Sequence, residues 1–105
     1  MHISAMKTFQ IEISDPVGLH ARPASMFVEL ANRFVADIRL CNLSAPEQWV
    51  NAKSILGVLT SAVKQGDQIE VRAEGSDEEA AAEALETLVR GEFKDDAEEA
   101  KAEAA

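Results

Sequence analysis

The chain has 105 residues and a formal net charge of −9 at pH 7, a size that fits one domain with one modest hydrophobic core. The acidic balance argues against sequence-independent binding to nucleic acid, which requires clustered Lys and Arg, so its partners are expected to be proteins. A signal-peptide pattern and an apolar run of bilayer length are both missing from the sequence, which predicts a cytoplasmic protein without membrane insertion.

The first predicted element is a strand that begins at Lys7. Residues 1–5 show no pattern and are expected to form a loose N-terminus. Phe9, Ile11 and Ile13 then alternate with polar residues, which is the period of a strand with one wet face. Turn-forming residues over 14–18 end this strand and lead into a loop.

A helix is predicted from Ala21 to about Arg33. Pro23 has no N–H and a φ already near the helical value, so it fits the first turn of a helix. Apolar residues then recur at steps of three and four and predict one buried face, made of Ala24, Phe27, Val28, Ala31 and Phe34.

This arrangement places His20 at the N-cap, where unpaired backbone N–H groups and the helix dipole favour an anion such as phosphate. A neutral imidazole is a nucleophile, and the guanidinium of Arg22 can grip phosphate oxygens, so the spacing suggests a histidine that accepts a phosphoryl group. A histidine that only caps the helix by a side-chain hydrogen bond is the alternative. Asp15 either orients the imidazole or forms a turn.

Two short strands are predicted next, over 38–41 and 49–51, joined by a loop over Asn42–Gln48. Cys41 is the sole cysteine, so an intramolecular disulfide is impossible and the free thiol fits a reducing compartment. It is interpreted as a strand residue and not as a nucleophile.

A second helix is predicted after Ser54, which is placed at its N-cap. Helical spacing continues through Ile55, Val58, Leu59, Ala62 and Val63, and Gly66-Asp67 is expected to close the helix. Leu56 lies at the edge of this stripe. Ile69, Val71 and Ala73 then alternate as a further strand, which ends at Gly75.

The last predicted helix begins at a capping box over Ser76–Glu79, in which the first and fourth side chains bond reciprocally to the backbone. Its buried stripe consists of Ala81, Ala84, Leu85, Leu88 and Val89, and Gly91 is placed at C′. Residues 94–105 form an acidic, Ala/Glu-rich tail with little to bury. The element order is β-α-β-β-α-β-α, which predicts helices on one side of an antiparallel sheet.

Two motifs in this chain resemble the signatures of a known family. Gly18-Leu-His-Ala-Arg-Pro-Ala24 is similar to the active-site signature of HPr, the histidine-containing phosphocarrier of the phosphoenolpyruvate:sugar phosphotransferase system. Asn51-Ala-Lys-Ser-Ile-Leu-Gly-Val58 resembles the family's second signature, around its regulatory serine. The resemblance covers residues 6–93 and implies an α+β open-faced two-layer sandwich, with three helices on a four-stranded antiparallel sheet. The Asn42–Gln48 loop is longer than is usual in the family.

The resemblance implies a carrier and not an enzyme. His20 would accept a phosphoryl group from phosphorylated enzyme I and pass it to enzyme IIA components, with Arg22 stabilising the phosphate. Ser54 would be a regulatory site for an HPr kinase/phosphorylase, and Ile55 and Leu56 either dock partners or pack into the core. The protein is expected to be a monomer without a cofactor. With only two histidines and no Cys/His cluster, no metal site is expected.

Three alternatives stay open. The protein acts mainly as a regulator through Ser54, or it carries phosphate to a non-transport acceptor such as a dihydroxyacetone kinase system. The third is an enzyme that uses His20 as a nucleophile towards a small phosphoester, although no second acid, base or metal cluster supports it.

Overall fold

A computed structural model describes residues 6–91 and 93. The predicted loose segment 1–5 and acidic tail 94–105 therefore lie outside the described residues. Four strands form one antiparallel sheet in the spatial order β1-β4-β2-β3. Their bounds are Lys7–Glu12 for β1, Asp37–Asn42 for β2, Trp49–Asn51 for β3 and Gln68–Glu74 for β4.

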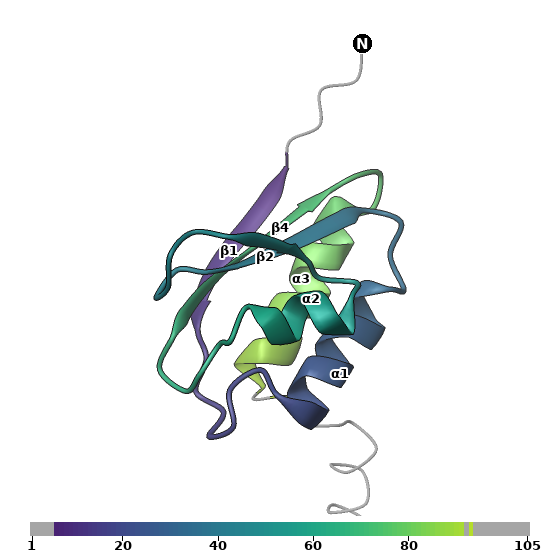
Figure 1. Cartoon of the computed structure of the whole chain (residues 1–105). Coiled ribbons are helices and arrows are strands. Elements are labelled where there is room, and N and C mark those ends of the chain that lie inside the picture. The colour runs from purple at the N-terminus through teal and green to yellow at the C-terminus, as the bar shows by residue number, and fades with distance from the viewer. Residues whose placement is uncertain (1–5, 92, 94–105) are drawn as a thin grey trace, which may run out of the picture.

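Three helices cover one face of this sheet and leave the other face open (Figure 1). They are α1 (Ala21–Ala31), α2 (Ile55–Thr60) and α3 (Glu78–Arg90). Helix α3 packs on β1 and β4, while α1 packs against both α2 and α3. The predicted two-layer fold and the order β-α-β-β-α-β-α are confirmed. None of the helices described is both long and apolar enough to cross a membrane.

The core lies between the sheet and the helices because the strands alternate in register. Phe9 pairs with Val71, Val71 with Leu40, and Leu40 with Val50, so one apolar row crosses all four strands. All four side chains are buried, and each contributes about 1.5–3 kcal/mol relative to exposure. The alternation of apolar and polar residues in the sequence thus predicted which face of the sheet is buried.

Helix α1 ends two residues before the predicted Arg33. Asn32 is its C-cap, and the Asn32 amide donates to the carbonyls of Val28 at 2.9 Å and Lys53 at 3.0 Å. Of the predicted stripe, three residues are buried and two, Val28 and Phe34, are half-buried.

Helix α2 is shorter than predicted, since it ends at Thr60 and not near Gly66. Ala62 has a left-handed backbone with φ 52°, which a continuing helix does not allow. Val63 is buried as expected, but outside the helix, where its carbonyl accepts a hydrogen bond from the Leu19 N–H at 3.1 Å. The chain from 61 to 67 is therefore an irregular segment that leads to β4.

The predicted capping box of α3 is wrong. The N-cap is Asp77, which makes no side-chain bond to the helix. Its carboxylate instead accepts hydrogen bonds from the N–H groups of Val35 and Ala36, both at 2.8 Å. In the predicted box, the Glu79 side chain would accept from the Ser76 N–H. In the structure, the Glu78 side chain accepts from the Gly75 N–H at 2.9 Å, so both partners lie one residue earlier.

The C-terminal end of α3 also differs from the prediction. Gly91 is the C-cap with φ −80°, so it does not supply the left-handed residue expected at C′. A left-handed backbone occurs two residues after this C-cap, at Phe93, with φ 60°. The Phe93 side chain is buried, and its N–H donates to the Leu88 carbonyl at 3.0 Å.

The sequence pattern placed Asn42 in the loop Asn42–Gln48, but in the structure Asn42 is the last residue of β2. Its side chain is buried and donates to the Ser61 carbonyl and to a carboxylate oxygen of Asp67, both at 3.1 Å. Its neighbour Cys41 is a fully buried strand residue, as predicted.

Asp77 provides a test of how the loop after α1 is held. Its hydrogen bond from the Val35 N–H, with a further one from Ala36, holds the pKa of the carboxyl below its usual value of 3.8. A carboxyl with a lowered folded-state pKa stabilises the fold above its ordinary pKa, and this contribution disappears as pH falls through the lowered value.

We predict that Asp77→Ala lowers the free energy of unfolding at neutral pH, because two backbone N–H groups lose their acceptor. The variant should also lose less stability than the parent protein on acidification below about pH 4. Denaturant unfolding at several pH values measures both effects, with the exposed Glu79→Ala as the control. Parallel pH profiles for parent and Asp77→Ala would contradict this account.

Candidate functional site

The loop between β1 and α1 is held in a compact turn. The Asp15 carboxylate accepts a hydrogen bond from the Val17 N–H at 3.0 Å. The Asp15 backbone carbonyl accepts one from the Gly18 N–H at 2.9 Å. This is the turn-forming role that was one of the two interpretations of Asp15. The loop then continues through Leu19, whose side chain is buried.

Gly18 packs this loop against the segment that follows α2. Its φ is +64°, and a Cβ at this position would lie 2.3 Å from the Val63 carbonyl oxygen and 2.8 Å from the Lys64 Cα. No side chain fits in this space. The close approach allows the adjacent Leu19 N–H to reach the same carbonyl.

His20 follows directly as the N-cap of α1. Its backbone is extended, with φ −122° and ψ 162°, and its side chain makes no capping hydrogen bond. The residue is exposed. The geometry therefore does not support a histidine whose imidazole is occupied in capping, and it leaves the ring at the surface beside the first N–H groups of a helix.

The first turn of α1 carries the remaining residues of the motif. Ala21 has φ 44°, a left-handed conformation that costs a residue with a side chain about 1–3 kcal/mol and often occurs at functional sites. Pro23 is buried, whereas Arg22 is exposed. Arg22 thus lies at the surface in the first turn, two residues after His20.

Ser54 is the N-cap of α2, as predicted. Its hydroxyl oxygen accepts a hydrogen bond from the Gly57 N–H at 3.1 Å, and its carbonyl accepts one from the Val58 N–H at 3.0 Å. A Cβ on Gly57 would lie 3.0 Å from the Asn51 carbonyl, so the first turn of α2 is tightly packed against the end of β3.

His20 and Ser54 lie at opposite ends of α1. At the C-terminal end of α1, the Lys53 ammonium donates to the Phe34 carbonyl at 2.6 Å, and Asn32 binds the Lys53 carbonyl. At the other end, the chain after α2 contacts the loop that carries His20. Helix α2 therefore returns along α1 from the C-terminal end of α1 towards its start, and the 11 residues of α1 make it about 16 Å long.

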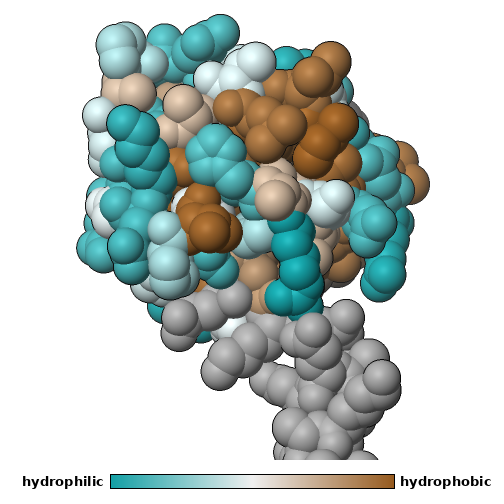
Figure 2. Space-filling view, turned by 60° about the horizontal axis from the view of Figure 1, so that its bottom comes forward, coloured by the Kyte–Doolittle hydropathy of each residue, from teal (hydrophilic) through white to brown (hydrophobic). Residues whose placement is uncertain are grey.

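Ile55 and Leu56 begin α2 directly after Ser54 and are exposed, by 40% and 72% respectively. They are not core residues, which excludes one of the two interpretations of this pair. Val17 in the His20 loop is 55% exposed and was not identified from the sequence, because one valine among turn residues carries no periodic signal. Figure 2 shows one large apolar area and smaller, separate apolar areas among hydrophilic side chains.

Among the residues described, no group of three or more His, Cys, Asp or Glu side chains is arranged to hold a metal ion. The chemistry that the arrangement offers is that of an exposed imidazole, an exposed guanidinium and a helix N-terminus. This combination suits a surface group that meets an anion presented by another molecule.

Comparisons with known proteins give one consistent result. Residues 7–91 match the family model described as the PTS HPr component phosphorylation site. The chain is 48% identical over 84 residues to the phosphocarrier protein HPr of Lysinibacillus sphaericus, which covers 80% of this chain and 92% of that protein. It is 41% identical over 83 residues to the HPr-like protein Crh of Bacillus subtilis, which covers 79% of this chain and 94% of the relative.

A solved structure shows the same fold. The crystal structure of HPr-C-His from Thermoanaerobacter tengcongensis superimposes with a TM-score of 0.78 at 42% identity. The match covers 83% of this chain and 94% of that chain.

The contact between Gly18 and Val63 gives a prediction. Gly18→Ala should lower the free energy of unfolding by more than about 1 kcal/mol, because the new methyl group meets a backbone oxygen that has to move. Gly66→Ala is the matched control, since Gly66 also has a positive φ but a Cβ there would meet nothing within 4 Å. Denaturant unfolding of both variants compares them. Equal losses of stability would mean that the close approach does not matter.

Proposed function

This chain belongs to the HPr family of the phosphotransferase system, and on that premise we propose that it carries a phosphoryl group on His20. The donor is phosphorylated enzyme I and the acceptors are enzyme IIA components. The observation that carries the proposal is the exposed imidazole at the N-terminus of α1, which makes no capping hydrogen bond. The protein acts as a carrier, in the cytoplasm and as a monomer.

The transfer itself requires little from the protein. A neutral imidazole nitrogen of His20 forms a bond to phosphorus while the bond between phosphorus and the donor breaks, and the reverse exchange passes the group to the acceptor. The N-terminus of α1 stabilises the charge on the phosphohistidine by about 0.3–1 kcal/mol at an exposed site. Such modest stabilisation suits a carrier, because a deeper anion site would retain the group.

Arg22 adds a charge-assisted contact to the phosphate oxygens in this proposal. Its exposed position in the first turn places the guanidinium on the same end of α1 as His20. A planar guanidinium can bind two oxygens at once, which orients the phosphoryl group as well as stabilising it.

Ser54 regulates this transfer through the docking surface, which we define as Val17, Ile55 and Leu56. Ser54 and His20 lie at opposite ends of α1, whose length of about 16 Å is roughly twice the Debye length of about 8 Å at physiological salt. A phosphate on Ser54 therefore acts on His20 only weakly by direct electrostatics. Ile55 and Leu56 directly follow Ser54, where about two added negative charges act on any partner that docks there.

A second candidate is a regulatory protein that acts mainly through phosphorylated Ser54. The similarity to the HPr-like protein Crh favours it. The presence of both His20 and Arg22 favours the carrier. Transfer to a dihydroxyacetone kinase system, as the final acceptor, uses the same His20 chemistry and differs only in the partner.

The carrier function is tested by phosphorylation with enzyme I and phosphoenolpyruvate. His20→Ala should abolish the acid-labile phosphoryl group seen by mass spectrometry of the intact protein, with little loss of stability because His20 makes no capping bond. His2→Ala is the control and should accept the group as the parent protein does. Acid-labile phosphorylation that persists in His20→Ala would refute the assignment.

Arg22→Ala should still accept the phosphoryl group but transfer it more slowly, by about tenfold or more, because a charge-assisted contact is lost while the nucleophile remains. Rapid-quench measurements of both half-reactions give the rates. If both rates match the parent protein, Arg22 has no role in transfer.

The docking surface is tested by two substitutions at the start of α2. Ser54→Asp and Leu56→Glu should each raise the KM for the carrier in the enzyme I reaction, because both add negative charge on or beside this surface. The melting temperature should stay nearly unchanged, because Asp is also a favoured N-cap residue and Leu56 is exposed. Ser76→Asp and Leu43→Glu are the matched controls, since they add the same charges at exposed positions outside α2. An unchanged KM for both α2 variants would show that partners dock elsewhere.

A further inference from the structure

The open face of the sheet carries a pocket on the side away from the helices. Its volume is about 170 Å³, and it is lined by Met6, Asp37, Arg39, Trp49, Arg72 and Glu74. Five of these residues come from β2, β3 and β4, and Met6 directly precedes β1. The pocket thus lies on the opposite side of the sheet from α1 and α2, and the proposed phosphoryl transfer does not use it.

The register places like charges opposite each other in this pocket. Arg39 on β2 pairs with Arg72 on β4, and Asp37 pairs with Glu74. Like charges directly opposite across a sheet are destabilising. An oxyanion between the two guanidinium groups and a cation between the two carboxylates would remove both repulsions.

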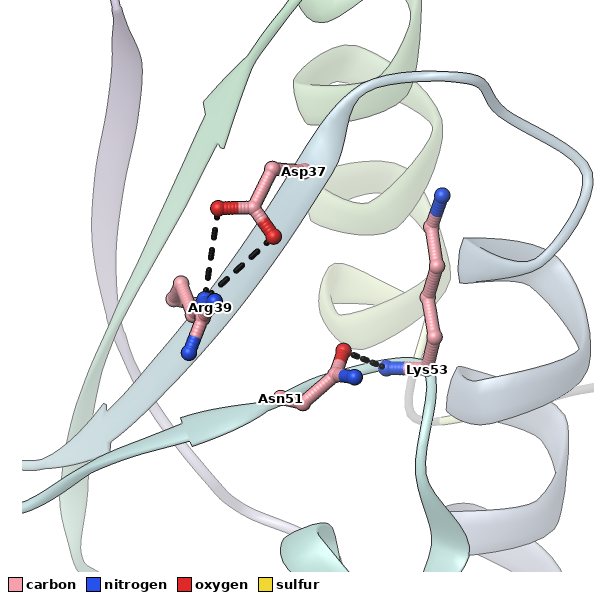
Figure 3. A network of polar contacts seen from close by, with 4 residues as sticks. All are labelled: Asp37, Arg39, Asn51 and Lys53. Atoms are coloured by element: carbon pink, nitrogen blue, oxygen red, sulfur yellow. Dashed lines mark hydrogen bonds and ion pairs between the residues drawn. The ribbon is translucent and has the colours of Figure 1, made fainter.

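Among the described residues, both arginines make their hydrogen bonds through Nε. The Arg39 Nε lies 3.3 Å from each carboxylate oxygen of Asp37, and the Arg72 Nε donates to Glu70 at 2.9 Å. Figure 3 shows the Asp37 contact, and it shows Asn51, the other cross-strand neighbour of Arg39, bonded to the Lys53 N–H instead. Within residues 6–91 and 93, the terminal nitrogens of Arg39 and Arg72 make no hydrogen bond.

Trp49 gives the pocket a rigid aromatic wall. The Arg72 guanidinium carbon lies 4.0 Å from the centre of the Trp49 ring, a cation–π contact that fixes both side chains. The indole N–H donates to Glu47 at 3.1 Å, which fixes the ring from the loop side. Met6, which is 44% exposed, supplies a second apolar surface.

We propose that this pocket binds a free amino acid with an apolar side chain. The carboxylate lies between the terminal nitrogens of Arg39 and Arg72, the ammonium group faces Asp37 and Glu74, and the side chain contacts Trp49 and Met6. Two observations favour a zwitterion over a simple anion. The formal charges of the four charged lining residues sum to zero, and the chain as a whole carries a net charge of −9. The overall electrostatic field therefore does not attract a simple anion.

The size of the pocket supports the same class of ligand. Sites for drug-sized molecules measure about 300–1,000 Å³, so a pocket of about 170 Å³ holds a smaller molecule. A single amino acid fits this description, and a peptide or nucleotide does not.

The test is a titration of the full chain with L-leucine, followed by two-dimensional NMR of backbone amides and of the Trp49 indole N–H. Saturable shifts confined to the indole and to residues of the pocket are expected. 4-Methylpentanoate and isopentylamine, which lack the ammonium and the carboxylate respectively, should bind about tenfold more weakly or worse, because each loses one charge-assisted contact. Equal affinity of either analogue would overturn the zwitterion assignment.

Arg39→Gln should weaken leucine binding by about tenfold or more. The matched control is Arg90→Gln, which removes an exposed, ion-paired arginine from α3 and should leave binding unchanged. His20→Ala should also bind leucine normally, so this result is independent of phosphoryl transfer. No saturable shift in the parent protein, or unchanged binding in a folded Arg39→Gln, would refute the proposal.

Discussion

The contact between two irregular segments, the loop before α1 and the chain after α2, positions the candidate site. Gly18 lies against the Val63 carbonyl, and the Leu19 N–H bonds to that carbonyl. Just before this contact, Ile13 exchanges hydrogen bonds with Asp67 at 2.9 Å and Gly66 at 2.7 Å. The chain that leads to His20 is thereby fastened to the chain that leads to β4. The exposed imidazole is thus presented by a supported loop, and its position depends on backbone contacts and not on its own side chain.

The same contact determines how the two motifs relate. Because the chain after α2 reaches the start of α1, and Lys53 reaches its end, α2 has to return along α1 towards its start. His20 and Ser54 are therefore separated along one helix, and Ile55 and Leu56 directly follow Ser54. In the proposed function, a partner that covers α2 while it reaches His20 would contact both positions, and the shared docking surface would couple them.

Local patterns predicted the parts of the fold that depend on local physics. Alternation identified the inner face of the strands, Pro23 and the apolar spacing identified the start of α1, and Ser54 was identified as a cap. Long-range contacts explain the errors. The apolar spacing of α2 continues to Val63, but the left-handed Ala62 ends the helix, and no residue type signals that conformation.

In the candidate site and the pocket, too, local patterns were informative, whereas features that depend on long-range contacts were missed. His20, Arg22 and Ser54 were proposed from their types, their spacing and the resemblance of the two motifs to family signatures, and the structure places them at the starts of α1 and α2. The cap of α3 was wrongly predicted at Ser76, because the true N-cap Asp77 binds Val35 and Ala36, more than 40 residues away in sequence. The pairing of Arg39 with Arg72 beside Trp49 depends on strand order and register, which no local window contains.

The burial of Cys41 has a practical consequence for handling the protein. The thiol is fully buried in β2, between Trp49 on β3 and Glu70 on β4 in the register of the sheet. Two folded copies cannot bring their thiols into contact, since disulfide formation requires the sulfur atoms to meet at about 2.05 Å. Covalent dimers that accumulate during storage in air therefore report how often the sheet opens, and a non-reducing gel becomes a simple assay of local unfolding.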